Sequence, residues 1–316
     1  MSKIKVLDRF KNYKIINEII KEKIENANNK CLVPLGNNTY SLNNTIILLK
    51  KIGTESSYGS VYLSVIKRHS KIKFITKIQV FTYDAMKEIR YLKLLTKYAY
   101  LNKNIHLPII YNNITCDYFN KNNNKLPENL LKKSNNINSY NSLFVELANG
   151  DLNNFLKTYK KINIDLIHNI LAQCFIGILT LHNNNIIHND THIGNFLYFN
   201  IYKKGCFKYT YKDLIFYIEN IGFNWVIWDF GLSKDLNQIH LSMRIKYIIK
   251  DYITLLKSFI KHLINAGIYD NDDIIEIKKY INNNFVNEYI FFKLLIKNNL
   301  LFSKNPIGTV ITTIKL

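Results

Sequence analysis

The sequence contains little glycine, proline, cysteine or arginine. Of its 316 residues, 11 are Gly, 4 are Pro and 4 are Cys. The four cysteines stand far apart and form no CxxC pair, which argues against a disulfide framework or a zinc site and favours a reducing compartment. The start, MSKIKVLDRFKNYK, has no apolar segment of the kind that a secretory signal requires. A hydrophobic content of 47% nevertheless excludes wholesale disorder.

Long apolar runs are missing as well. None reaches the roughly 18 residues that a membrane-spanning helix requires. The longest candidate, residues 166–181, contains His168, Asn169 and Gln173 and therefore predicts a buried helix. We expect no membrane span.

The scarcity of arginine governs how the net charge of +20 is interpreted. Only 4 of the 43 basic residues are Arg, while Asn occurs 45 times. An excess of Lys, Asn, Ile and Tyr is typical of an AT-rich genome, so a solvated basic surface explains the charge. The alternative is attraction to acidic partners, namely phosphates, anionic lipids or acidic protein segments. Specific recognition of nucleic acid depends on Arg and is not expected.

The hydrophobic pattern changes along the chain from strand-like to helical. Residues 8–26 show helical spacing, and 27–44 are loop-like. Strand patterns then dominate to about residue 147, with one helix at 85–98. Helices dominate afterwards, at 152–158, 164–182, 245–264, 272–282 and 288–295, with strand patterns that include 207–211 and 214–218 between them. We therefore predict an α+β protein in three parts. These are an N-terminal extension (1–44), a five-stranded small lobe with one helix (45–147, with an Asn- and Lys-rich insert at 112–142) and a helical large lobe (148–316).

Two polar motifs contain the residues of chemical interest. One is the loop 188–195, which reads His-Asn-Asp-Thr-His-Ile-Gly-Asn, and the other is Trp-Asp-Phe-Gly, whose Asp229 stands 34 residues after Asn195. Phosphoryl transfer needs a carboxylate to accept a hydroxyl proton, oxygen ligands for Mg²⁺ and a cation to hold the phosphates. Asp190 fits the first role, and Asn195 and Asp229 fit the second. Lys77, in the strand pattern FITKIQV, fits the third.

This ordered set resembles the eukaryotic-type protein kinases. LHNNNIIHNDTHIGN followed by WDFGLS looks like their catalytic loop and DFG segment. Lys77 resembles the lysine of their third strand, with Lys73 as an alternative on the same strand face. Glu88 resembles the helical partner of that lysine, or is a surface charge. Asp251 resembles the buried aspartate of the large lobe's central helix.

The nucleotide site is implied by the same resemblance. FVELANGDL looks like the hinge, where Glu146 and Leu147 would offer backbone groups to adenine. Asp151 is a candidate ribose contact, or a charge at a helix N-terminus. The segment IGTESSYGSVYL resembles the glycine-rich loop that covers the phosphates. Its candidate nucleotide contacts are Ile52, Gly53, Gly59 and Val61.

The sequence departs from the kinase pattern in several places. The glycine-rich loop lacks its middle Gly and has one extra residue. His192 stands where Ser/Thr kinases have a Lys, and would donate a hydrogen bond to the transferred phosphoryl group. His188 is expected to pack under Phe230. The segment from Asp229 to Asp251 is short and has no Ala-Pro-Glu motif. Its only Ser or Thr acceptors are Ser233 and Ser242, and we expect catalysis not to require their phosphorylation.

The resemblance implies a bilobal protein-kinase-like fold and a serine/threonine protein kinase that uses ATP and Mg²⁺. The long pattern around both motifs resembles kinases of large nucleocytoplasmic DNA viruses, with features reminiscent of haspin. It implies an acidic or virion protein as substrate, and location in the host cytoplasm or a virion. Two alternatives remain open: a small-molecule kinase of the aminoglycoside or choline type, suggested by His192, and a pseudokinase that acts as a scaffold.

Overall fold

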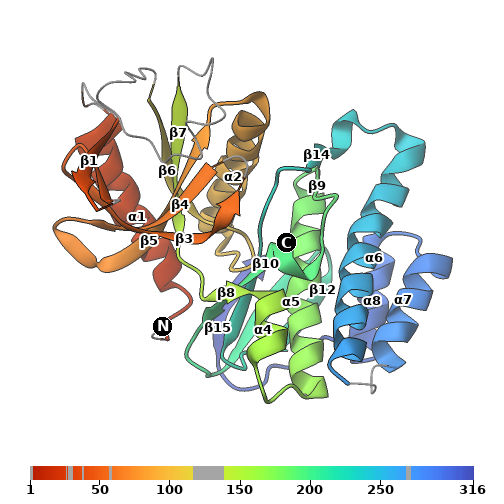
Figure 1. Ribbon diagram of the computed structural model, residues 1–316. Helices are drawn as coiled ribbons and strands as arrows, with labels where there is room; N and C mark the ends of the chain where they lie inside the picture. The colour runs from red at the N-terminus through yellow and green to blue at the C-terminus, as the bar shows by residue number, and fades with distance from the viewer. Residues whose placement is uncertain are drawn as a thin grey trace. The chain divides into compact units, whose positions relative to one another are not determined.

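The computed structural model describes residues 3–25, 27, 31–37, 39–56, 59–116, 139–267 and 272–316. The chain divides into two compact units. The small unit comprises Asp8–Thr96 and Ile109–Leu147, and the large unit comprises Met1–Leu7, Lys97–Pro108 and Ala148–Leu316. Both strands and helices are present, so the predicted α+β class is confirmed (Figure 1).

The small unit is built on one antiparallel sheet of seven strands in the order β1-β2-β3-β4-β5-β7-β6. The sheet curls, with α1 and α2 beside it (Figure 1). β5 alternates buried and less buried side chains from Phe74 to Ile78, as in a strand with one face on the core, whereas β7 is buried throughout. The strands are β1 (Leu32–Gly36), β2 (Thr39–Leu42), β3 (Ile46–Ser56), β4 (Gly59–Ile66), β5 (His69–Val80), β6 (Ile110–Cys116) and β7 (Tyr140–Glu146).

Four of the five strands that the sequence predicts for this region match β3, β4, β5 and β7. The fifth, predicted at 106–111, overlaps only the start of β6, and β1 and β2 were missed. β1 and β2 lie at 32–42, within the stretch predicted to be a loop, and β2 pairs with β3 through Tyr40 and Leu48. Short strands with Pro34 and several polar residues carry a weak period-two signal, which explains the error. The predicted insert at 112–142 also starts and ends inside strands, and its residues 117–138 lie outside the described residues.

The N-terminal helix is confirmed as α1 (Asp8–Ile20), followed by a π-helical turn η1 (Lys21–Glu25). Residue 26 of the predicted helix lies outside the described residues. Ile16, Ile20 and Ile24 are fully buried, as their helical spacing indicates. The second helix of this region, α2, spans Tyr83–Asn102.

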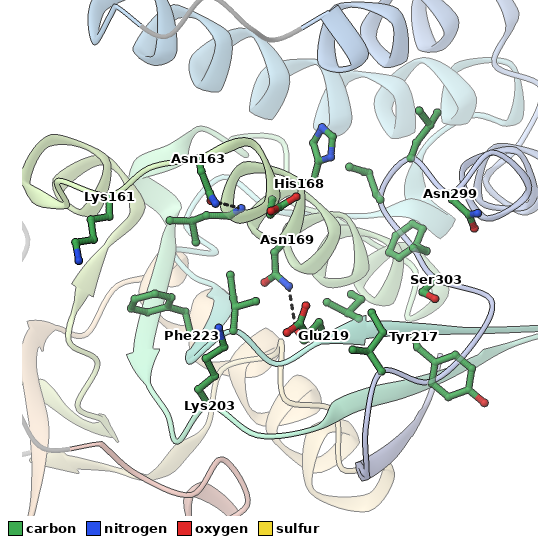
Figure 2. Close-up of a pocket in the computed structure, with 18 of the residues that line it drawn as sticks. Lys161, Asn163, His168, Asn169, Lys203, Tyr217, Glu219, Phe223, Asn299 and Ser303 are labelled. Atoms are coloured by element: carbon green, nitrogen blue, oxygen red, sulfur yellow. Dashed lines mark hydrogen bonds between the residues drawn. The ribbon is translucent and has the colours of Figure 1, made fainter.

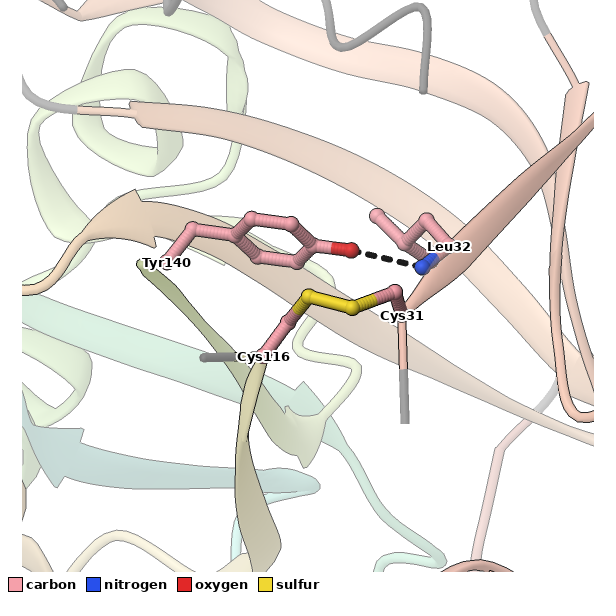
Figure 3. Close-up of a disulfide and its surroundings, with 4 residues drawn as sticks. All are labelled: Cys31, Leu32, Cys116 and Tyr140. Atoms are coloured by element: carbon pink, nitrogen blue, oxygen red, sulfur yellow. Dashed lines mark hydrogen bonds between the residues drawn. A yellow bond between two sulfur atoms is a disulfide. The ribbon is translucent and has the colours of Figure 1, made fainter. Parts of the chain in front are cut away.

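A disulfide joins Cys31 to Cys116, which contradicts the prediction of a chain without disulfides (Figure 3). The two cysteines are 85 residues apart in sequence. They meet because Cys31 immediately precedes β1 and Cys116 is the last residue of β6. Beside them, the Leu32 N–H donates to the Tyr140 hydroxyl at 2.6 Å. Sequence spacing does not show such a pairing, because it depends on where two strands end in space. Cys174 and Cys206 are buried free thiols.

The large unit packs helices around three small sheets. Strand orders are β13-β10-β8, β12-β11-β15 and β14-β9. Its helices are α4 (Leu152–Thr158), α5 (Ile164–Asn183), α6 (Leu241–Asn265), α7 (Asp272–Asn284) and α8 (Glu288–Lys297). The strands are β8 (Gly150–Asp151), β9 (Ile186–Ile187), β10 (Phe196–Asn200), β11 (Cys206–Tyr211), β12 (Leu214–Glu219), β13 (Phe223–Ile227), β14 (Lys234–Asp235) and β15 (Val310–Lys315).

Helix α5 forms the core of the large unit. It begins at the cap residue Asn163, whose side chain accepts from the Leu166 N–H. Within the described residues, α5 is the one helix long and apolar enough to cross a membrane, and 83% of its apolar window is buried inside the protein. His168, Asn169 and Gln173 interrupt its apolar surface. The Asn169 amide donates to the Glu219 carbonyl at 2.8 Å.

Candidate functional site

Three predicted nucleotide contacts form a row across the sheet of the small unit. Ile52 on β3 pairs with Val61 on β4, and Val61 pairs with Lys77 on β5. Directly paired residues of antiparallel strands project from the same face of a sheet. The row therefore presents two aliphatic side chains and one ammonium group side by side.

Lys77 and Glu88 form an ion pair despite their short separation of 11 residues. The Lys77 ammonium lies 3.1 Å from both carboxylate oxygens of Glu88. The side chains are 26% and 9% exposed, respectively. Helix α2 starts only two residues after β5 ends, so Glu88 lies one and a half turns into the helix and reaches back to the strand. Lys73, the alternative, is exposed.

The glycine-rich segment is described in part. Gly53 lies in β3, while residues 57–58 and the side chains of 53–58 lie outside the described part. Gly59 starts β4, where a Cβ atom would lie 2.3 Å from the Ile78 carbonyl oxygen. The close approach of β4 and β5 therefore requires a glycine at position 59, independently of any nucleotide contact.

In the large unit, hydrogen bonds join the two polar motifs. The Asn195 amide nitrogen donates to the Asp190 carbonyl at 2.8 Å and to the Asp190 carboxylate at 3.2 Å. The Trp228 N–H donates to the Asn195 carbonyl at 2.8 Å. Asp229 follows directly, exposed and at a positive φ of 66°. Asp190, Asn195 and Asp229 therefore lie in one cluster, although Asp190 and Asp229 are 39 residues apart in sequence.

Asp251, on α6, holds the loop that contains Asp190. Its carboxylate accepts the backbone N–H groups of His188 and Asn189 at 2.8 and 2.7 Å. The Thr191 hydroxyl donates to the Asp251 carbonyl. Asp251 is fully buried, as predicted, and its carboxylate satisfies the backbone N–H groups of the two residues that precede Asp190.

A buried histidine completes this support. His182 contacts Asp251 through Nε2 at 3.1 Å and Glu288 through Nδ1 at 2.7 Å. Burial alone would lower the pKa of His182, but the carboxylates of Glu288 and Asp251 outweigh it and raise that pKa to about 10. His182 is thus an imidazolium at neutral pH, with both N–H groups on carboxylates. Sequence reasoning missed this role, since its partner Glu288 is 106 residues away.

His188 is confirmed as a packing residue. It is fully buried, and its ring centroid lies 5.2 Å from that of Phe230. Burial lowers the pKa of His188, so the ring is neutral at pH 7. Its Nε2 donates to the Trp228 carbonyl at 2.8 Å, which is a further link between the two motifs.

His192 lies at the exposed edge of the same cluster. Its Nδ1 accepts the Gly194 N–H at 3.0 Å, so the proton of a neutral ring is on Nε2. Nε2 is 3.6 Å from the Asp190 carboxylate. The N–H group is thus available as a donor beside Asp190, and the His192 side chain is 47% exposed.

The oxygen atoms of this cluster fit a magnesium ion. Because the Asn195 amide nitrogen is bonded to Asp190, the amide oxygen is the atom free to act as a ligand. One Asp229 carboxylate oxygen accepts the Gly231 N–H at 3.3 Å, and the exposed side chain leaves the other for a cation. Mg²⁺ binds through one or two such ligands together with phosphate oxygens. The described residues form no cluster of three or more His, Cys, Asp or Glu side chains that could hold a metal ion.

Two predicted nucleotide residues already have structural partners. The Asp151 side chain caps α4 by accepting the Asn154 N–H at 2.7 Å. The Glu146 carboxylate is buried in an ion pair with Arg9. Leu147 follows β7 and is half-buried. Arg9 is a partner that sequence reasoning missed, because a lone Arg in an amphipathic helix carries no signal of a distant carboxylate.

The two serines after the DFG motif differ in access. Ser233 is fully buried, and its hydroxyl donates to the His188 carbonyl at 3.4 Å. Ser242 is exposed. Lys250 donates to the Asn189 amide oxygen at 2.7 Å, which brings a cation beside the residue that precedes Asp190.

A separate cavity of about 660 Å³ lies elsewhere in the large unit (Figure 2). It is lined by the start of α5, the end of β12 and residues 299–303. Lys161 and Lys203 lie at one side, and Tyr217 and Ser303 at the other. Its lining is distinct from the cluster around Asp190.

Comparisons with known proteins complete the description of the site. No family model matches the sequence, and no curated protein shows a significant match to it.

Proposed function

We propose that this chain is an ATP- and Mg²⁺-dependent serine/threonine protein kinase with a bilobal protein-kinase-like fold. The small unit would be the nucleotide-binding lobe and the large unit the catalytic lobe. The observation that carries the proposal is the bonded cluster of Asp190, Asn195 and the Trp228–Asp229 segment. Its groups are of the kinds that hydroxyl phosphorylation requires, namely a carboxylate for the acceptor proton and oxygen ligands for Mg²⁺.

Each residue has a defined task. Asp190 orients the acceptor hydroxyl and takes its proton as the hydroxyl oxygen bonds to the γ-phosphorus of ATP. The bond from that phosphorus to the β–γ bridging oxygen breaks, and ADP leaves. His192 donates a hydrogen bond from Nε2 to the phosphoryl group, on which charge is redistributed during transfer. Lys77, held by Glu88, binds the α- and β-phosphates. Asn195 and Asp229 would hold Mg²⁺, which neutralises phosphate charge when bound.

The row of Ile52, Val61 and Lys77 supports the nucleotide assignment. Two aliphatic side chains beside a cation suit a planar base followed by phosphates. The ion pair with Lys77, in which the Glu88 side chain is only 9% exposed, favours Glu88 as the partner of that lysine over a surface charge.

Ser233 is buried, and the Asp251 carboxylate holds the loop before Asp190 through two backbone N–H groups, which supports catalysis without phosphorylation of the segment after Asp229 even though Ser242 is exposed. Phosphatase treatment of the purified protein should leave its activity unchanged. Loss of activity on dephosphorylation would refute this part of the proposal.

The test is transfer of label from γ-labelled ATP, with Mg²⁺, to casein, to histones and to the protein itself. Phosphoamino-acid analysis should find labelled Ser or Thr. Absence of protein label, with ATP still bound, would favour the two alternatives. A panel of small hydroxylated and aminated metabolites would then separate a small-molecule kinase from a scaffold.

A further inference from the structure

A buried ion pair joins the N-terminal helix to the end of β7. Arg9 of α1 donates from Nε and Nη2 to the two carboxylate oxygens of Glu146, at 2.7 and 2.6 Å. The side chains are 2% and 7% exposed. Such a bidentate pair fixes the orientation of the carboxylate relative to the guanidinium as well as their distance.

Glu146 is held by more than Arg9. Its Oε1 also accepts the Ile109 N–H at 3.0 Å, while the Glu146 N–H donates to the Ile109 carbonyl at 3.3 Å. Asn112 on β6 makes further contacts with this segment. Its side-chain amide donates to the Asn17 amide oxygen of α1 at 3.4 Å and to the Glu25 carboxylate of η1 at 3.3 Å. The N-terminal helix is thus bonded to the start of β6 and to the end of β7.

The pair lies where the chain enters and leaves the small unit. The chain passes between the units at four points, and Arg9, Ile109 and Glu146 each lie within two residues of one of them. The segment that leaves at Leu147 is the one proposed to offer backbone groups to adenine. Glu146 is the last residue of β7 and directly precedes this segment.

We propose that Arg9 is a positioning residue for nucleotide binding: through Glu146 it fixes the backbone of Glu146 and Leu147 against which adenine would bind. This inference rests on the proposed function. Replacing a buried ion pair by apolar side chains of similar volume is often neutral or stabilising, and in some proteins such a pair instead fixes a specific geometry. The pair therefore serves to set the backbone, and the N-terminal helix becomes part of the nucleotide site.

The experiment compares three variants with the parent protein. Arg9→Met leaves the Glu146 carboxylate without its cation, and Arg9→Met/Glu146→Met replaces the whole pair by apolar groups. Lys11→Met is the matched control, since Lys11 is on the same helix with a side chain 74% exposed. Binding of a non-hydrolysable ATP analogue with Mg²⁺ is measured by calorimetry, well below each variant's Tm, and KM for ATP and kcat are measured separately.

We expect Arg9→Met to weaken analogue binding at least tenfold, about 1.4 kcal/mol. KM for ATP should rise while kcat at saturating ATP stays within a few-fold. The double variant should bind as weakly as Arg9→Met even if its Tm returns to the parental value, and Lys11→Met should match the parent.

Parental affinity in the double variant would overturn the inference, because the pair would then be needed only for folding. If Arg9→Met fails to fold, the double variant decides alone. Failure of the parent protein itself to bind the analogue would instead refute the proposed function, and the inference with it.

Discussion

Loss of the disulfide between Cys31 and Cys116 should destabilise the small unit strongly. The bond closes a loop over a sequence separation of 85 residues. In the chain-entropy treatment, a loop of this length corresponds to about 4–5 kcal/mol of stabilisation through the unfolded state, and measured values for native disulfides are typically about 2–4 kcal/mol. Unfolding a unit of roughly 130 residues has an entropy near 0.27 kcal/mol/K, so Tm should fall by about 8–15 °C.

The assay is thermal unfolding of the parent protein and of Cys31→Ser/Cys116→Ser, each with and without reductant. Reductant should lower Tm of the parent and leave Tm of the variant unchanged, which makes the variant its own control. Thiol titration of the denatured, unreduced parent should find two free thiols, those of Cys174 and Cys206. Four free thiols, or equal Tm values in all four samples, would refute the pairing and the reasoning from loop length. An oxidised pair would also require exposure of the protein to an oxidising environment.

Three further perturbations test other parts of the structure. The free energy of unfolding of the large unit should fall as pH rises from about 6.5 to about 10, because the pKa of His182 is raised in the folded state and the stabilisation by its imidazolium is complete only below pH 6.5. His182→Gln should flatten this pH dependence of stability. An unchanged slope in the variant would contradict the assignment. Lys77→Met should lower kcat/KM by orders of magnitude and Tm by little, whereas Lys73→Met should affect neither. Gly59→Ala should lower Tm by several degrees, since its Cβ would collide with the Ile78 carbonyl; a parental Tm would show that β4 can shift.

Local patterns predicted most elements of the fold. The helical period gave α5 at 164–183 and the three C-terminal helices within a few residues, because each buries one apolar stripe. The alternating hairpin of β11 and β12 was also predicted, and its Phe207 and Phe216 are buried. Strand β15 was missed: it pairs with β11 from more than 100 residues away, and such partners leave no local signal.

The candidate site was predictable where a role depends on residue type and not where it depends on a distant partner. Asp190, Asn195 and Asp229 were found because their spacing and chemistry suit phosphoryl transfer, and the structure brings them together. Arg9 and the disulfide were missed, because nothing near either residue in sequence indicates what it meets across the sheet.

The most direct test of the account is the phosphotransferase activity of the Asp190→Asn variant. The matched control is Asp213→Asn, which removes an aspartate of the β11–β12 turn that accepts the Tyr289 hydroxyl in an exposed hydrogen bond. Turnover of γ-labelled ATP onto protein should fall by at least about 100-fold in Asp190→Asn, with an unchanged Tm and retained nucleotide binding, and should remain parental in Asp213→Asn. Parental activity in Asp190→Asn, or none in the parent protein, would contradict the central claim that Asp190 is the base of a kinase.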